Sequence, residues 1–123
     1  MKDLTLKKVS KDSRGNIYIL EGMETYPELT IFQTKSNKAR GGCVHNINDE
    51  ICTVISGRVT YVIGDRVESG KVGESITIPK GTPHYFFSNT DSVVIEWGAI
   101  PEEKKFKHKE FRAIVDKLND TTD

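Results

Sequence analysis

Two stretches of the sequence decide the fold, and the first is Gly41–Glu50, which reads Gly-Gly-Cys-Val-His-Asn-Ile-Asn-Asp-Glu. Within it Cys43 and His45 are two residues apart, so on a strand their side chains point to the same face of the sheet. Glu50 follows five residues later, across an expected turn or bulge. This spacing predicts that a thiol, an imidazole and a carboxylate lie near one another.

The second stretch is Gly73–His84, which reads Gly-Glu-Ser-Ile-Thr-Ile-Pro-Lys-Gly-Thr-Pro-His. Pro79 and Gly81 predict a tight turn, because Pro presets one backbone angle and Gly tolerates left-handed conformations. His84 then opens a strand that returns into the sheet. Asn89 lies shortly beyond it.

The rest of the chain up to about residue 100 is divided by Gly and Pro into short segments rich in β-forming residues. This spacing is typical of an all-β sandwich or barrel, and no alternation of strands and helices suggests a parallel sheet. The predicted strands are 17–20, 29–34, 51–55, 58–63, 74–78, 84–87 and 92–97.

The tail of the chain differs in pattern from the β-rich part. From Pro101 the β signal stops, and apolar residues recur at helical spacing with charged residues between them. We therefore divide the chain into a barrel over 1–100 and a tail over 101–123, with one amphipathic helix over about 107–119 that packs on the barrel or on a partner subunit. The apolar residues of the helix are Phe111, Ile114, Val115 and Leu118.

Composition restricts the classes of function. The chain has 123 residues, enough for one hydrophobic core, and equal numbers of basic and acidic residues, 18 of each, which argues against nucleic-acid binding. No apolar run approaches the roughly 20 residues that span a bilayer, and the first residues lack the apolar stretch of a signal peptide, so we expect a cytoplasmic protein. Cys43 and Cys52 are too few for a disulfide scaffold, and Cys52 is expected in the core.

The two stretches resemble the two motifs of the cupin superfamily. The first motif of that family runs Gly, a gap, His-x-His, a few residues, Glu, six residues and Gly, which His45, Glu50 and Gly57 match. The second runs Gly, five residues, Pro-x-Gly, two residues and His, which the stretch ending at His84 matches, with Asn89 one residue late. The resemblance implies a small jelly-roll barrel, a double-stranded β-helix, with a ligand site at its mouth.

The cupin resemblance also implies a metal site. Metal-binding cupins use two His and the Glu of the first motif and the His of the second, and His45, Glu50 and His84 match three of these positions. Cys43 stands where the family has its first His, and it is either a fourth ligand, an acid/base group or a packed apolar residue. The expected cofactor is one divalent ion, Fe, Mn, Zn or Ni; the alternative is a polar mouth without metal.

A second, narrower resemblance concerns the substrate. Asp12–Ile17 and Arg40–His45 are similar to stretches of the sugar-nucleotide 3,4-ketoisomerases and 3,5-epimerases, enzymes that need no metal. In that family a His moves protons beside a keto group and an Arg engages the diphosphate or sugar. The resemblance implies a catalytic role for His45, with the departures that Cys43 stands at the family's first His and Glu50 at its Gln. We expect Cys43, as a substitute acid/base group, and His84 to be catalytic as well.

Three further residues are expected to contact the substrate: Arg40, Tyr85 and Glu96. Taken together, the sequence predicts a metal-binding cupin that isomerises or epimerises a sugar or sugar-nucleotide-like small molecule. The alternatives are a metal-dependent dioxygenase and a ligand-binding cupin without catalysis. We expect a homodimer, because open sheet edges and an amphipathic tail both need cover, and neither nucleic acid nor membrane as partner.

Overall fold

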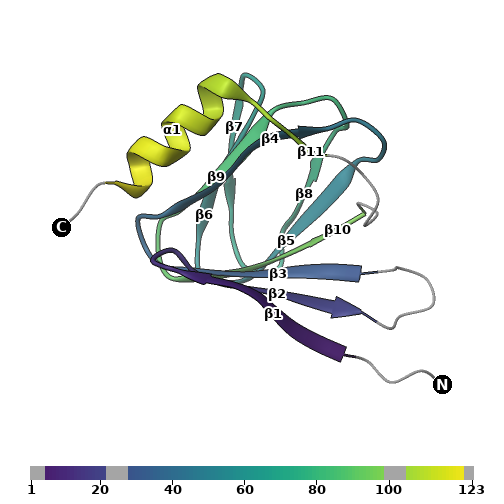
Figure 1. Ribbon diagram of the computed structural model, residues 1–123, viewed down its shortest axis with the longest axis vertical. Coiled ribbons are helices and arrows are strands. Elements are labelled where there is room, and N and C mark those ends of the chain that lie inside the picture. Colours follow the sequence, from purple (N-terminus) through teal and green to yellow (C-terminus); the bar gives the residue numbers. More distant parts are fainter. Residues whose placement is uncertain (1–4, 22–27, 99–104, 121–123) are drawn as a thin grey trace.

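A computed structural model describes residues 5–21, 28–98 and 105–120. The described residues form eleven strands and one C-terminal helix, drawn in Figure 1. The elements are β1 (Thr5–Asp12), β2 (Gly15–Glu21), β3 (Glu28–Thr34), β4 (Ala39–His45), β5 (Glu50–Ser56), β6 (Val59–Ile63), β7 (Arg66–Gly70), β8 (Ser75–Ile78), β9 (His84–Ser88), β10 (Ser92–Trp97), β11 (Lys105–Lys107) and α1 (Lys109–Asn119).

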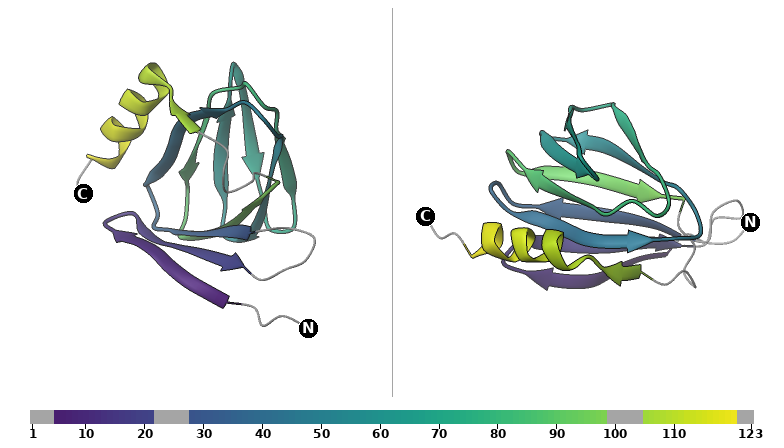
Figure 2. Two further views of the ribbon diagram at one scale, coloured as in Figure 1. Left: turned by 45° about the vertical axis from the view of Figure 1, so that its right-hand side comes forward. Right: turned by 90° about the horizontal axis from the view of Figure 1, so that it is seen from above.

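The strands form two antiparallel sheets that face each other. The six-stranded sheet has the order β1-β2-β3-β10-β5-β8, and the five-stranded sheet has the order β11-β4-β9-β6-β7. The β1-β2-β3 and β6-β7 neighbours are consecutive in sequence, but from β3 to β6 and from β7 to β10 each connection passes from one sheet to the other, as the views of Figure 2 illustrate. The predicted all-β jelly roll with a short C-terminal helix is confirmed.

The core lies between the two sheets and follows from period-two alternation. In β6, β9 and β10 every second residue is buried and the residues between are half-buried, as expected for strands with one face on the core. The predicted burial of Cys52 is confirmed. The core cluster consists of Cys52, Val54, Val59, Tyr61, Ile63, Ile76, Ile78, Phe86 and Val94.

Helix α1 packs against β4 and β9 of its own barrel, and Figure 1 places it against the five-stranded sheet, away from β1. His108 caps its N-terminus by accepting a hydrogen bond from the Phe111 amide, so the helix begins two residues later than predicted. At its other end the Asn119 side chain bonds the amide and carbonyl of Ala39 at 2.7 and 2.9 Å, which covers the edge of β4. In the described part of the chain, no helix is long and apolar enough to cross a membrane.

Four strands of the structure, β1, β4, β7 and β11, are not among the ranges predicted from the sequence. Two of them, β11 and β1, show why. The expectation that β structure ends at Pro101 is wrong, because β11 adds three residues, Lys105–Lys107, to the edge of β4. Strand β1 is an exposed edge strand with a bulge between Lys8 and Ser10. Both depend on pairing with a neighbour and carry little local hydrophobic pattern, so periodicity alone does not reveal them.

Candidate metal centre

A bulge in β4 positions the first motif. The pairing of β4 with β9 shifts between Gly41 and Cys43, so that Cys43 lies opposite His84. Gly42 has a φ of +84° and sits under α1: a Cβ there would lie 2.8 Å from the Arg112 Cα. Only glycine therefore allows both the backbone conformation and the close approach of the helix.

Three side chains from three strands meet inside the barrel. His45 ends β4, Glu50 begins β5 and His84 begins β9. One ligand atom from each lies within 4.8 Å of the other two, and the exposed fractions are 0% for His45, 1% for Glu50 and 6% for His84. We call these three residues the triad.

Backbone carbonyls orient both imidazoles. The Nδ1 of His45 lies 3.1 Å from the Asn48 carbonyl oxygen, and the Nδ1 of His84 lies 3.0 Å from that of Thr82. A carbonyl only accepts hydrogen bonds, so each Nδ1–H donates to its carbonyl and each Nε2 is left to face the interior. This is the arrangement by which proteins fix metal-binding imidazoles.

The two Nε2 atoms are directed at one carboxylate. His45 Nε2 contacts Glu50 Oε1, and His84 Nε2 lies 3.8 Å from the same oxygen. Two imidazole lone pairs and a carboxylate in a buried site repel one another unless a cation or a proton lies between them. The donor set fits a divalent metal ion, because two His and one carboxylate form a competent three-ligand site with open positions.

The loops that carry the triad are joined to each other. The Gly81 amide donates to the His45 carbonyl at 2.7 Å, and the Lys80 amide donates to Asp49 Oδ1 at 2.9 Å. The turn of the second motif is thus fastened to the loop that follows the first. These bonds fix the His45 and His84 segments relative to each other, and the two imidazole rings lie with their centroids 5.0 Å apart.

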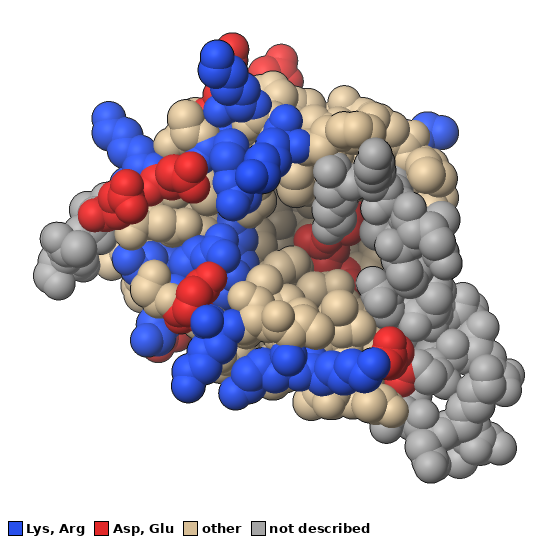
Figure 3. Space-filling model, viewed as in Figure 1, with Lys and Arg blue, Asp and Glu red and all other residues tan. Residues whose placement is uncertain are grey.

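A second polar layer lies beneath the triad. Glu96, 8% exposed, faces inward opposite Cys52, and the Cys52 thiol donates to its Oε2 at 3.8 Å. Burial raises the pKa of the Cys52 thiol, and the charges of Glu96 and Glu50 raise it further, so the thiol stays protonated and acts as a donor. Figure 3 shows a hollow in this face of the molecule with acidic atoms at its bottom.

Of the predicted site residues, Cys43 and Glu96 lie near the triad. Cys43 is half-buried and lies opposite His84, so both side chains leave the sheet on the same side. Its sulfur is not among the ligand atoms grouped within 4.8 Å. Tyr85 leaves β9 on the other face from His84, and its ring packs on Phe111 of α1 with centroids 5.2 Å apart.

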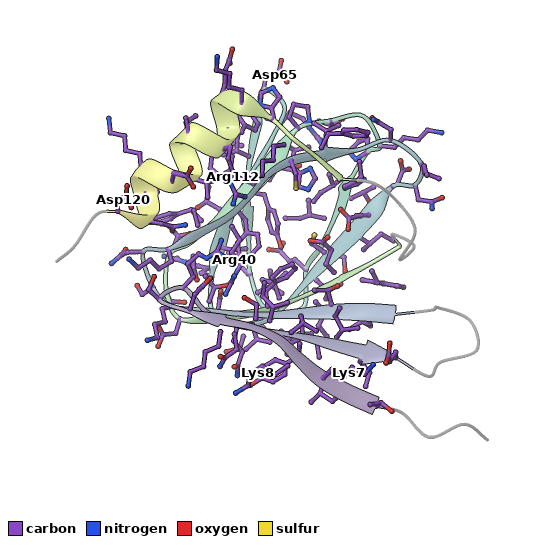
Figure 4. The ribbon with its side chains drawn as sticks, viewed as in Figure 1. Lys7, Lys8, Arg40, Asp65, Arg112 and Asp120 are labelled. Atoms are coloured by element: carbon purple, nitrogen blue, oxygen red, sulfur yellow. The ribbon has the colours of Figure 1, made fainter. Side chains whose placement is uncertain are left out.

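Arg40 lies away from the triad. It is 3% exposed, its Nε donates to Thr34 Oγ1 at 2.8 Å and its Nη2 donates to the Gln33 carbonyl at 3.1 Å. Burial and, to a smaller extent, the charge of Arg14 lower the pKa of the guanidinium to about 10, while the charge of Asp12 opposes this. Figure 4 shows Arg40 between β4 and β3.

Arg40 belongs to a polar cluster at the other end of the interior. Ser88 Oγ lies 2.7 Å from Ser92 Oγ and 3.4 Å from the Thr34 carbonyl oxygen. Apolar residues, among them Phe86 opposite Arg40, lie between this cluster and the triad layer. We call Thr34, Arg40, Ser88 and Ser92 the plug.

One residue beside the site was not expected from the sequence. Lys107 of β11 lies opposite Cys43, so its side chain leaves the sheet on the same side as the thiol. It is exposed and supplies a positive charge beside the site. Nothing in the local sequence distinguishes it from the other charged residues of the tail, because its position depends on the pairing of β11.

Comparison with known families identifies the class of protein. The family model described as the cupin domain matches residues 40–100, a range that contains the whole triad. Together with the jelly-roll topology and the buried His–Glu–His set, this match shows that the chain belongs to the cupin superfamily. No curated protein matches the sequence.

Solved structures agree on the fold. The capsular polysaccharide assembling protein CapF from Staphylococcus aureus is 18% identical with a TM-score of 0.66, over 85% of this chain and 32% of CapF. A variant of the Bacillus subtilis oxalate decarboxylase OxdC is 14% identical with a TM-score of 0.68, over 88% of this chain and 31% of that one. A conserved Streptococcus pyogenes protein of unknown function is 16% identical with a TM-score of 0.56, over 81% and 76%. The chain spans about a third of the length of CapF and of the decarboxylase, and at these identities the likeness concerns the fold.

Proposed function

We propose that this protein binds one divalent metal ion through the triad and isomerises or epimerises a small carbohydrate-like molecule. The observation that carries the metal proposal is the convergence of two carbonyl-oriented imidazoles on Glu50. Fe(II) and Mn suit two His and one carboxylate, and Zn and Ni accept the same donors. A bound metal would act as a Lewis acid that polarises a carbonyl or hydroxyl oxygen of the substrate.

The isomerase proposal rests on two side chains near the triad that could transfer protons to and from a substrate. Isomerisation takes a proton from a carbon beside a carbonyl group and returns one to the neighbouring carbon, whereas epimerisation returns it to the opposite face of the same carbon; neither needs an oxidant. Both reactions need acid/base groups beside the substrate. Cys43 comes from the five-stranded sheet and Glu96 from the six-stranded sheet, so the two groups approach the interior from opposite sides. We assign them as the acid/base pair.

The surroundings favour a polyhydroxylated substrate. Glu96 and Cys52 form a polar layer below the triad, where a carboxylate accepts hydrogen bonds from substrate hydroxyls. Lys107, exposed beside Cys43, would attract a phosphate or other anionic group that stays outside the interior. We therefore propose a sugar phosphate or a nucleotide-linked sugar as substrate class.

The test is solvent deuterium exchange. Protein loaded with Fe(II), Mn, Zn or Ni is incubated in D2O with aldose and ketose phosphates and with nucleotide-linked keto sugars, and proton NMR follows the carbon beside the carbonyl. We expect deuterium at that carbon with at least one substrate, and a loss of about 100-fold or more in Glu96→Gln, in line with removal of an acid/base group. Glu68→Gln, on exposed β7, is the matched control.

The outcomes separate the two parts of the proposal. Metal uptake without exchange in any substrate would overturn the isomerase and leave the metal site. Full exchange in His45→Ala and His84→Ala variants would place the chemistry outside the triad. Loss of exchange in Cys43→Ser with unchanged metal content would assign the thiol to proton transfer rather than to metal binding.

A dioxygenase is the second candidate. The feature that favours it is the 2-His-1-carboxylate composition of the triad, which non-haem Fe(II) oxygenases use to leave positions open. Oxygen-electrode measurements on the Fe(II)-loaded protein distinguish the two candidates. Substrate-dependent oxygen consumption supports the dioxygenase, and exchange without oxygen consumption supports the isomerase.

A further inference from the structure

The outer face of the six-stranded sheet is unusually apolar. Residues opposite each other on antiparallel strands share a face, so the register defines which side chains point away from the core. One row across the six strands runs Lys8, Tyr18, Ile31, Ile95, Thr53, Ser75, and a second contains Leu6, Leu20, Leu29, Trp97, Ile51, Thr77. With Val93, the apolar members form what we call the outer patch: Leu6, Tyr18, Leu20, Leu29, Ile31, Ile51, Val93, Ile95 and Trp97.

No charged side chain interrupts the outer patch on its four middle strands. The charged residues of β2, β3, β10 and β5 whose side chains the structure describes are Glu21, Glu96 and Glu50, and all three fall on the inner face by register, although 29% of the chain is charged. The outer face of an antiparallel sheet in contact with water is ordinarily polar. The helix does not cover the outer patch, because α1 packs on β4 and β9 of the other sheet.

We propose that the outer patch is the interface with a second copy of this chain. Each outward residue of the sheet covers about 4.8 Å by 6.8 Å, so the nine residues of the outer patch give on the order of 300 Å² in projection, and the whole outer face of six strands gives on the order of 500 Å². Side chains expose more area than their projection, so the whole face, with the outer patch at its centre, approaches the roughly 800 Å² per partner of a standard interface. Sheets that pack face to face in this way are a common arrangement.

The chemistry of the patch suits self-association. A two-fold interface brings the same surface of both copies together, so a charged patch would repel itself and an uncharged one does not. Trp97 and Tyr18 are residue types that dominate binding energy in interfaces. With a two-fold axis along the strands, Lys8 at the β1 edge of one copy lies over the hydroxyls of Ser75 and Thr77 at the β8 edge of the other.

This interface differs from the one expected from the sequence. The amphipathic tail packs on its own barrel, and α1 and β11 together cover the edge of β4. The dimer then makes no contact with the triad of either copy, because the triad lies on the inner side of the six-stranded sheet and the interface lies on its outer face. The inference is independent of the proposed catalytic activity.

The experiment combines mass and fluorescence. Size-exclusion chromatography with light scattering is expected to give twice the chain mass of 13.8 kDa. The chain has a single tryptophan, so the emission of Trp97 reports on the outer patch directly. Dilution below the dissociation constant is expected to shift that emission to the red as the mass falls to that of one chain.

Variants locate the interface. Ile95→Lys in the centre of the outer patch is expected to give a monomer, and Leu6→Glu, at a position 57% exposed and tolerant of change, is expected to weaken the dimer by about 10-fold or more, from the loss of one buried apolar side chain. Val67→Glu, on β7 of the other sheet and 69% exposed, is the matched control and should leave the dimer intact. A wild-type protein with the mass of one chain at every concentration, or a dimer retained in folded Ile95→Lys and Leu6→Glu, overturns the proposal.

Discussion

The triad and the plug occupy the same barrel interior but differ in how their polar groups are arranged. In the plug, a cation donates to oxygen acceptors of β3 and the serine hydroxyls bond each other. In the triad, the Nδ1 atoms of two imidazoles bond backbone carbonyls, and their Nε2 atoms face one carboxylate. A buried polar cluster that pairs donors with acceptors holds strands together, whereas one that gathers acceptors at a point is suited to bind a cation.

The largest expected effect on stability comes from the bulge that sets the triad. Gly42→Ala places a Cβ 2.8 Å from the Arg112 Cα at a φ of +84°. The substitution therefore strains the backbone of β4 and also forces α1 to move. We expect the free energy of unfolding to fall by about 2–4 kcal/mol, which corresponds to a decrease of about 8–16 °C in Tm measured by thermal unfolding. Metal binding should also be weaker.

Gly73 provides the control for backbone strain alone. It has a φ of +88° with no atom within 4 Å of an added Cβ, so Gly73→Ala should cost only about 1 kcal/mol. Equal losses in the two variants would contradict the role of helix contact at Gly42.

A smaller effect is expected from the plug. Arg40→Met keeps most of the buried volume but leaves the Thr34 hydroxyl and the Gln33 carbonyl without the guanidinium, which should cost about 1–3 kcal/mol by chemical denaturation. Metal affinity should stay within about twofold, because an apolar layer separates the plug from the triad, whereas a 1.4 kcal/mol coupling would change it tenfold. Arg58→Met, at an exposed position, is the control. A loss of metal binding in Arg40→Met but not in Arg58→Met would contradict the independence of the plug and the triad.

The sequence predicts where the core strands lie better than it predicts which neighbours their side chains contact. Period-two patterns locate the core strands, and the spacing of Cys43 and His45 correctly puts them on one face. The bulge at Gly42 interrupts the alternation of inward and outward residues along β4, so that Arg40 also points inward and bonds β3. Tyr85, expected at the substrate, packs on α1 instead. Such positions depend on register between distant strands, which no local pattern encodes.

The smallest effect concerns the turn next to the plug. The side-chain hydrogen bond from Arg14 lowers the pKa of Asp12 below its ordinary value of 3.8, so this pair stabilises the fold above that pH and the contribution disappears as the pH falls through the lowered pKa. For an exposed pair it amounts to less than about 1 kcal/mol. Denaturant unfolding of Asp12→Asn between pH 7 and 2 should therefore converge with wild type in acid, with Asp65→Asn as control; a constant difference at every pH would contradict the ion pair.

The central claim, that the triad is a metal site, is tested most directly by calorimetric titration of metal-stripped protein with Mn, Fe(II), Zn and Ni. We predict one ion per chain for at least one metal, with affinity reduced about 100-fold or more in Glu50→Gln, since loss of a first ligand costs at least what loss of its supporting partner does, and unchanged in Glu68→Gln. A folded wild-type protein that takes up none of the four metals, or a Glu50→Gln variant that binds as tightly as wild type, would contradict the account.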